Sequence, residues 1–372
     1  MINGDAERLA LAALVRVSEP GDPLLAREVA TAGPIETWGR RLASHPEVDP
    51  VRELRVAAIA GMRLVCPGDE EWPAGLADLD KAGPAGELGA PIALWVRGTL
   101  PLNEACEKSI GIVGSRAATS YGLHVAGEVG FHLAEQGWSV VSGAAYGIDA
   151  AAHRGALAAP GPTIAVLACG VDVAYPRSHD ALLARMATEG LIVSEAPPGG
   201  LPLRRRFLVR NRLIAALSSG SVVVEAGVRS GALSTARHAR RIGRPVMAVP
   251  GPVTSGMSSG CHLLLRQWPE SVLVTTADEV IECCGPMGML AALPLSPTGP
   301  RDGLDVVMAR VLEAVPSRRP RDAQWIAERS GEGEFVVERM LAPLLANGLI
   351  ESRPEGYRLT ELGRKPSGGA AS

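Results

Sequence analysis

The chain has 372 residues, of which 47% are hydrophobic, 21% charged and 3% aromatic, and its formal net charge is −3. This composition is typical of a globular protein of two or three domains and argues against a disordered or fibrous chain. The six cysteines have no CxxC spacing, which argues against a disulfide framework or a zinc site. Because neither a signal-peptide pattern nor a membrane-length apolar run occurs, we expect a cytoplasmic protein with reduced thiols and no membrane contact.

The first part of the chain is predicted to be helical. Apolar residues such as Leu11, Leu14 and Val15 recur at helical spacing, and an EPGDP turn interrupts the pattern. We therefore expect a helical N-terminal domain over residues 1–65. The segment 66–108 is rich in glycine and proline, and we interpret it as a connector that leads into the next domain.

From residue 109 to residue 285, short apolar runs alternate with amphipathic stretches. The runs are SIGIVG, WSVVSGA, TIAVLACG, LIVSEA, SVVVEAG, RPVMAVPG and SVLV. Uniformly apolar strands separated by helices are typical of a parallel sheet that is covered on both faces. We expect an α/β fold, with a Rossmann-like doubly wound parallel sheet, over residues 109–285.

The C-terminal part begins with a segment rich in proline and glycine, 286–303, which we interpret as a linker. Residues 304–363 then show the pattern of three helices followed by a short hairpin, and this order predicts a winged-helix domain. Residues 364–372 are expected to form a tail.

Three loops with glycine are expected at the carboxyl ends of the strands, at residues 114–122, 142–149 and 225–235. In an open parallel sheet, ligands bind at this edge, where helix N-termini point N–H groups outward. Arg116 directly follows Gly114 and Ser115, so its guanidinium would lie beside a bound phosphate. Because neither GxGxxG nor GxxxxGK[ST] occurs, a nicotinamide site and a Walker-type site are disfavoured, and we expect no cofactor.

The stretch RRRFLVRNR, residues 204–212, holds five arginines around one of only three phenylalanines in the chain. Between residues 201 and 250 there are ten arginines, and the only acid is Glu225. Such an imbalance needs a compensating anion. Basic side chains around an aromatic ring are typical of single-strand binding, in which arginine contacts phosphate and the ring stacks on a base. Phe207 could instead be a core residue, and Asn211 could either cap locally or bind a base edge or a phosphate.

Two other functions stay open. One is a Rossmann-type nucleotide or nucleoside-phosphate hydrolase with Glu225 as its catalytic acid, although the expected PGGxGT-like loop is missing. The other is a duplex-binding regulator that acts through the winged helix. The histidines have no metal-ligand spacing and no nucleophile elbow occurs, so we expect neither a metal nor a catalytic residue.

Seven motifs in order resemble the DNA-processing protein family DprA, also called Smf. They are GIVGSRAATSYG, VVSGAAYGIDAAAHRGAL, CGVDVAYPRSH, LIVSEAPPG, FLVRNRLIAALS, VVVEAGVRSGALSTARHARRIGRPVMAVPG and SSGCHLLLRQ. The resemblance is close over about 105–285 and looser outside that range. It implies a non-catalytic cytosolic protein that binds single-stranded DNA, protects incoming strands and loads the recombinase RecA during natural transformation or recombination. It also implies a homodimer through the Rossmann domain.

The resemblance carries the family's GSR, SGxxxGID, FPxRNR and SGSL motifs onto this chain, and the residues themselves add Arg204 to Arg206. The predicted DNA-binding residues are Gly114, Ser115, Arg116, Ser142, Gly143, Gly147, Arg204, Arg205, Arg206, Phe207, Arg210, Asn211, Arg212, Ser230 and Gly231.

The chain departs from the family pattern at several positions. Leu208 stands where proline is usual and Tyr146 where arginine is common, so one phosphate contact is in doubt. We infer that Arg204 to Arg206 compensate for it. From 301 to 365 there are eleven basic and eleven acidic residues, and this balance favours a protein contact or weak duplex binding for the winged helix.

Overall fold

The computed structural model describes residues 3–81, 89–285 and 304–364. The chain divides into two compact units, Met1–Met289 and Leu290–Ser372. The predicted linker over 286–303 and the predicted tail after Arg364 lie outside the described residues.

The first unit is built on a nine-stranded sheet with the order β1-β2-β6-β5-β4-β3-β7-β8-β9. Its strands are β1 (Met62–Val65), β2 (Leu94–Arg97), β3 (Ser109–Val113), β4 (Ser139–Ser142), β5 (Thr163–Leu167), β6 (Leu191–Ser194), β7 (Gly220–Val223), β8 (Val246–Ala248) and β9 (Val272–Leu273). Strands β3 to β9 run parallel to one another, whereas β2 is antiparallel to both β1 and β6. The prediction of an α/β fold with a mostly parallel sheet is confirmed.

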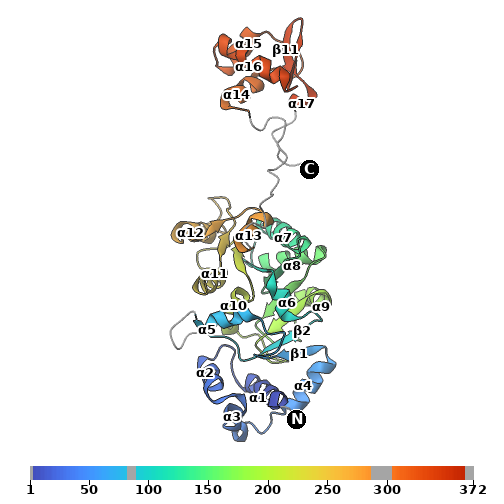
Figure 1. Ribbon diagram of the computed structural model, residues 1–372, viewed down its shortest axis with the longest axis vertical. Helices are drawn as coiled ribbons and strands as arrows, with labels where there is room; N and C mark the ends of the chain where they lie inside the picture. The colour runs from blue at the N-terminus through green and yellow to red at the C-terminus, as the bar shows by residue number, and fades with distance from the viewer. Residues whose placement is uncertain (1–2, 82–88, 286–303, 365–372) are drawn as a thin grey trace. The chain divides into compact units, whose positions relative to one another are not determined.

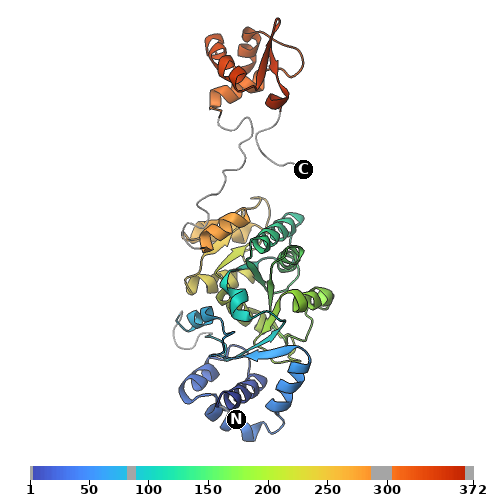
Figure 2. The same ribbon diagram turned by 45° about the vertical axis from the view of Figure 1, so that its right-hand side comes forward.

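Helices cover both faces of the parallel part of the sheet (Figures 1 and 2). They are α7 (Ser120–Glu135), α8 (Ile148–Ala158), η3 (Arg177–His179), α9 (Asp180–Glu189), α10 (Arg204–Ala216), α11 (Ala232–Arg241), α12 (Ser259–Gln267) and α13 (Ala277–Cys284). On one face, α10 and α11 bury Leu213 and Leu233 against the strands. On the other face, α8 and α9 bury Leu157 and Leu183. Each connecting loop at the carboxyl edge is therefore held between a buried strand and a buried helix.

The N-terminal residues form helices that pack on the antiparallel end of the same sheet. These elements are α1 (Asn3–Val17), α2 (Pro23–Ala32), α3 (Pro34–Gly39), η1 (Leu42–Ser44) and α4 (Pro50–Ile59). Leu11 of α1 and Ala57 of α4 share a core cluster with Leu64 of β1 and Trp95 of β2. The helices thus belong to the same compact unit as the sheet.

The segment expected to be a connector, 66–108, contributes to this core instead. It contains β2 together with η2 (Ala74–Ala77), α5 (Asp78–Lys81) and α6 (Leu102–Glu107). Leu76, Leu94 and Leu102 of this segment are fully buried. The sheet therefore begins at Met62 rather than at residue 109, because β1 and β2 extend it by an antiparallel pair.

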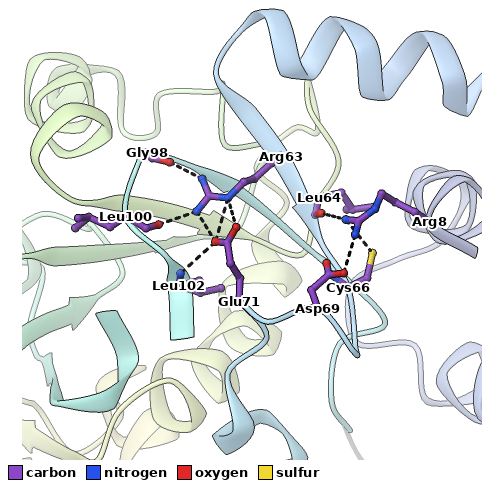
Figure 3. Close-up of polar contacts among 9 residues, drawn as sticks. All are labelled: Arg8, Arg63, Leu64, Cys66, Asp69, Glu71, Gly98, Leu100 and Leu102. Atoms are coloured by element: carbon purple, nitrogen blue, oxygen red, sulfur yellow. Dashed lines mark hydrogen bonds and ion pairs between the residues drawn. The ribbon is translucent and has the colours of Figure 1, made fainter. Parts of the chain in front are cut away.

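Two arginines fix the chain just after β1 (Figure 3). Arg8 of α1 lies 2.6 Å from the Asp69 carboxylate, and Arg63 of β1 lies 2.6 Å from that of Glu71. The Arg63 guanidinium holds the pKa of Glu71 below its ordinary value. Charged as well as apolar contacts therefore attach α1 and the loop after β1 to the sheet.

The second unit contains α14 (Val306–Ala314), α15 (Ala323–Ser330), α16 (Glu334–Ala346), α17 (Glu361–Arg364) and an antiparallel hairpin of β10 (Ile350–Arg353) and β11 (Gly356–Leu359). It has its own core, to which Leu312, Ile326, Leu341 and Leu359 contribute. Three helices followed by a hairpin lie where the sequence predicts them. In the part of the chain that the structure describes, no helix is long and apolar enough to cross a membrane.

Candidate nucleic-acid interface

The chain order of the sheet reverses between β3 and β7, which are adjacent parallel strands. The strands β4, β5 and β6 lie on one side of β3, whereas β7, β8 and β9 lie on the other. At such a switch point the two loops leave the sheet in opposite directions and open a crevice at the carboxyl edge, where ligands bind in this class of fold.

A groove of about 450 Å³ lies at this crevice. It brings together eight of the predicted residues from three separate segments of the chain, namely Gly114, Ser115, Arg116, Phe207, Arg210, Asn211, Ser230 and Gly231. The first three follow β3, the next three lie on α10, and the last two precede α11. Residues almost 120 positions apart in the sequence therefore share one surface.

The rim of the groove carries exposed arginine beside an aromatic ring. Arg116 is exposed, and the central carbon of its guanidinium lies 5.3 Å from the centroid of the half-buried Phe207 ring. Arg229, also exposed, lines the groove in the loop after β7. Arg229 is not among the DNA-binding residues predicted from the sequence. It could have been included, because it is a basic residue in a glycine-containing loop that follows a predicted strand. The rim thus offers positive charge and a partly exposed ring to a ligand.

The floor of the groove holds a buried arginine. Arg210 donates from Nη1 to the carbonyl oxygen of Gly143 at 3.0 Å and to that of Val166. Burial lowers the pKa of Arg210 to about 10, so it is still charged at neutral pH. Its buried Nε has no hydrogen-bond partner among the described residues. Arg210 therefore contributes positive charge to the groove while being held by backbone carbonyls.

Asp149 of α8 also lines the groove, beside Arg210. Its Oδ2 accepts hydrogen bonds from the backbone nitrogens of Gly143 at 3.2 Å and Ala145 at 3.3 Å. Burial raises the pKa of this carboxyl, and the nearby Arg210 guanidinium opposes that shift. Asp149 therefore orders the loop after β4, and its role is structural.

Asn211 joins two of the three segments. Its Nδ2 donates to the carbonyl oxygen of Gly231 at 3.2 Å, and the Ser230 hydroxyl accepts from the backbone nitrogen of Ala232 at 3.3 Å. These bonds fix the loop that leads into α11 against α10. The Asn211 bond reaches a residue 20 positions away in the sequence, so it is not the local cap considered for this residue.

Three other predicted contact residues support the loops instead of lining the groove. Ser142 is buried and donates to the carbonyl oxygen of Ile112 at 2.6 Å. A Cβ atom at Gly143 would lie 2.4 Å from the guanidinium nitrogens of Arg210. Gly147 has a φ of 77°, and a Cβ atom there would lie 2.2 Å from the carbonyl oxygen of Ser115. These residues let two loops and an arginine pack closely.

Two arginines at the start of α10 lie apart from the groove because they pair with an acid in the loop between α1 and α2. Arg205 and Arg206 contact the Glu19 carboxylate at 2.9 and 3.0 Å. Both line a second cavity, of about 620 Å³, on the other side of the helix. Arg204 is exposed and lines neither cavity.

Arg212 cannot reach a ligand in this structure. It is completely buried and lies 2.8 Å from the Glu195 carboxylate, which also accepts from the backbone nitrogen of Gly21. Its Nε donates to the carbonyl oxygen of Gly89 at 3.0 Å. The sequence predicts that Arg212 contacts DNA, but its side chain lies inside the core. The reason is that one side of α10 faces the interior of the protein.

Glu225, the acid of the hydrolase alternative, is buried and does not line the groove. Its two carboxylate oxygens accept from the backbone nitrogen of Thr119 at 2.9 Å and from the Thr119 hydroxyl at 2.6 Å. The same threonine hydroxyl caps the N-terminus of α7 by accepting from Gly122. Glu225 therefore fixes the start of α7.

The buried His153 of α8 is also placed structurally. Its Nδ1 lies 2.7 Å from the Thr163 hydroxyl, and burial lowers its pKa to about 3. It is neutral at physiological pH. Over residues 3–81, 89–285 and 304–364, no group of three or more His, Cys, Asp or Glu side chains could hold a metal ion.

Comparison with known proteins identifies related chains. Residues 63–285 match the family model described as DNA recombination-mediator protein A. The chain is 44% identical over 377 residues to a DprA-type DNA processing protein of Mycobacterium tuberculosis, with 96% of each chain covered. It is 37% identical over 280 residues to protein Smf of Escherichia coli, covering 72% of this chain and 71% of that protein.

Two solved structures are similar as well. The X-ray structure of DNA processing protein A from Streptococcus pneumoniae matches with a TM-score of 0.60 and 28% identity, covering 76% of this chain and 97% of that one. A structure that describes the single-stranded DNA binding mode of DNA processing protein A from Helicobacter pylori matches with a TM-score of 0.51 and 27% identity. It covers 59% of this chain and 94% of that one.

Proposed function

The chain belongs to the DNA recombination-mediator protein A family, and on that premise we propose that its groove binds a single strand of DNA. The observation that carries this proposal is the rim, where the exposed Arg116 lies over Phe207 and the exposed Arg229 lines the same groove. Guanidinium groups bind phosphates, and an aromatic ring stacks on a base that has left its own stack. A paired duplex hides its base faces, so this arrangement favours an unpaired strand.

We further propose that the protein protects incoming single strands and loads RecA onto them, without catalysis and in the cytoplasm. These finer points rest on the resemblance and on the relatives named above. We also propose that the protein is a homodimer through its Rossmann-like sheet. Likewise, we propose that residues 304–363 are a winged helix and that the N-terminal helices are a domain in their own right.

A salt series tests the binding proposal. Fluorescence anisotropy with a labelled single-stranded oligonucleotide should give tighter binding than with the matching duplex. In a plot of log affinity against log salt, Arg116→Ala should reduce the slope by about 0.7, because one phosphate contact is lost. Arg55→Ala, an exposed arginine on α4 away from the groove, is the matched control. Equal binding of both DNA forms, or unchanged binding by folded Arg116→Ala, would contradict the proposal.

A further inference from the structure

On the β4 and β5 side of the groove, the carboxyl edge of the sheet carries two exposed tyrosines that the groove does not include. Tyr146 follows β4 and is 49% exposed, and Tyr175 follows β5 and is 39% exposed. The chain has only four Tyr and three Phe. With Phe207, three of these seven rings therefore gather at one edge of one sheet, where burial does not account for them.

Tyr175 continues the aromatic surface of the groove. The centroid of its ring lies 5.2 Å from that of Phe207, with an angle of 52° between the two planes. Phe207 is in turn covered by Arg116 on the groove side. A strand that stacks a base on Phe207 therefore meets the Tyr175 ring next.

Tyr146 is held in one orientation although its ring is exposed. Its hydroxyl lies 2.8 Å from the Ser178 hydroxyl, and its ring meets that of His179 edge to face at a centroid distance of 4.9 Å. His179 is buried and its Nδ1 lies 3.0 Å from the carbonyl oxygen of Ala144. An exposed ring that is already immobile loses little conformational entropy on stacking with a ligand.

A basic side chain accompanies the two rings. Arg177 is exposed in η3, between Tyr175 and Ser178, and its side chain makes no hydrogen bond or ion pair with any residue that the structure describes. Of the nearby acids, Asp172 accepts from the backbone nitrogen of Gly199 at 2.8 Å, and Asp180 lies in the first turn of α9. Neither is within ion-pair distance of Arg177. We call Tyr146, Tyr175 and Arg177 the tyrosine shelf.

We propose that the tyrosine shelf is a second subsite for the same single strand of nucleic acid. Bases stack on Tyr175 and Tyr146, and Arg177 binds a phosphate between them. The strand then runs along the carboxyl edge of the sheet, from the groove at β3 and β7 toward β4 and β5. This inference rests on the proposed function, because the shelf extends the groove and does not replace it.

The shelf variants should separate stacking from charge. Replacing either tyrosine by leucine should weaken binding of a long oligonucleotide about tenfold, because one base–ring stack is lost, and should leave the salt slope unchanged. Arg177→Ala should instead reduce that slope by about 0.7. Tyr146→Phe and Tyr175→Phe keep the rings and should bind like the unmodified protein. Phe335→Leu, an exposed aromatic in the second unit, and Arg55→Ala are the matched controls.

Oligonucleotide length distinguishes the shelf from the groove. For short oligonucleotides that fill only the groove, the leucine variants should bind as well as the unmodified protein, and their defect should emerge as the length grows. A defect at every length would mean that the groove itself is disturbed and would overturn the shelf.

A fluorescence measurement on the unmodified protein tests the shelf without any variant. 2-Aminopurine placed at successive positions of a bound oligonucleotide should be quenched at two groups of positions, one for the adjacent rings of Phe207 and Tyr175 and one for Tyr146. Quenching at one group alone, or leucine variants within twofold of the unmodified protein at all lengths, would refute the shelf while leaving the proposed function intact. Failure of the unmodified protein to bind single strands would refute the proposed function first.

Discussion

Arginine has one role at the rim of the groove and a different role in the buried layer of side chains under that rim. At the rim, Arg116 is exposed and its guanidinium lies over the Phe207 ring. Beneath it, Arg212 is fully buried and paired with Glu195, and Arg210 is held by two backbone carbonyls. We propose that arginine binds the DNA in the first case, whereas in the second it is part of the fold. Changes at the rim should therefore alter binding, and changes beneath it should alter stability.

The largest expected effect lies beneath the rim. Arg212→Ala would leave the Glu195 carboxylate buried without its partner, which costs about 3–5 kcal/mol of folding free energy. Urea denaturation followed by tryptophan fluorescence would measure it. Arg116→Ala is the matched control, since exposed substitutions change stability by less than about 0.5 kcal/mol. Equal losses of folding free energy in Arg212→Ala and Arg116→Ala would contradict the distinction between the rim and the buried layer.

A pH dependence of stability should also arise from the buried His153 of α8. His153 has a folded-state pKa of about 3 against an ordinary value of 6.5, so the unfolded chain binds a proton that the folded chain excludes. Stability is then fully present above pH 6.5 and falls as the pH drops, by about 2 kcal/mol at pH 5. His153→Gln should reduce the fall in unfolding free energy between pH 7 and pH 5 by that amount. An unchanged pH profile would mean that the folded chain binds a proton at His153 as readily as the unfolded chain does.

At the rim itself, a substitution should weaken the binding of single-stranded DNA and leave the stability of the fold nearly unchanged. Phe207→Leu removes the ring but keeps an apolar side chain, so single-strand affinity should fall about tenfold while the salt slope stays constant. The unfolding free energy should change much less than in Arg212→Ala. A large loss of stability with normal affinity would place Phe207 in the core, as the alternative interpretation of the sequence had it.

The smallest effect should come from Glu19, whose carboxylate neutralises part of the positive charge of residues 204–212. Glu19 pairs with Arg205 and Arg206, and these arginines hold its pKa below the ordinary value. Glu19→Gln should release both guanidiniums and raise single-strand affinity roughly two- to fivefold, with a steeper salt slope. Glu189→Gln, whose exposed carboxylate pairs with Arg185, is the control. If affinity stays constant, the second cavity lies off the path of the DNA.

Much of the fold could be predicted because the strands of a covered parallel sheet are uniformly apolar. All seven apolar runs between 109 and 285 became strands. The strand β2 was missed because it is flanked by segments rich in glycine and proline, which were interpreted as a connector. Its burial comes from α1 and β6, which lie far away in the sequence.

The groove could be predicted only in part because charge was counted within one window of sequence. The ten arginines between 201 and 250 looked uncompensated, yet Glu19 lies 187 residues from Arg206 and Glu195 lies 17 residues from Arg212. Neither acid falls inside that window. Which arginines are free depends on long-range packing, and a local count cannot supply that information.

Gly143 links the two layers through size alone. Any side chain at position 143 would occupy the space of the Arg210 guanidinium. Arg210 can therefore take its place only because residue 143 has no side chain. Among natural variants of this protein, a bulkier residue at 143 should therefore appear only together with a shorter one at 210.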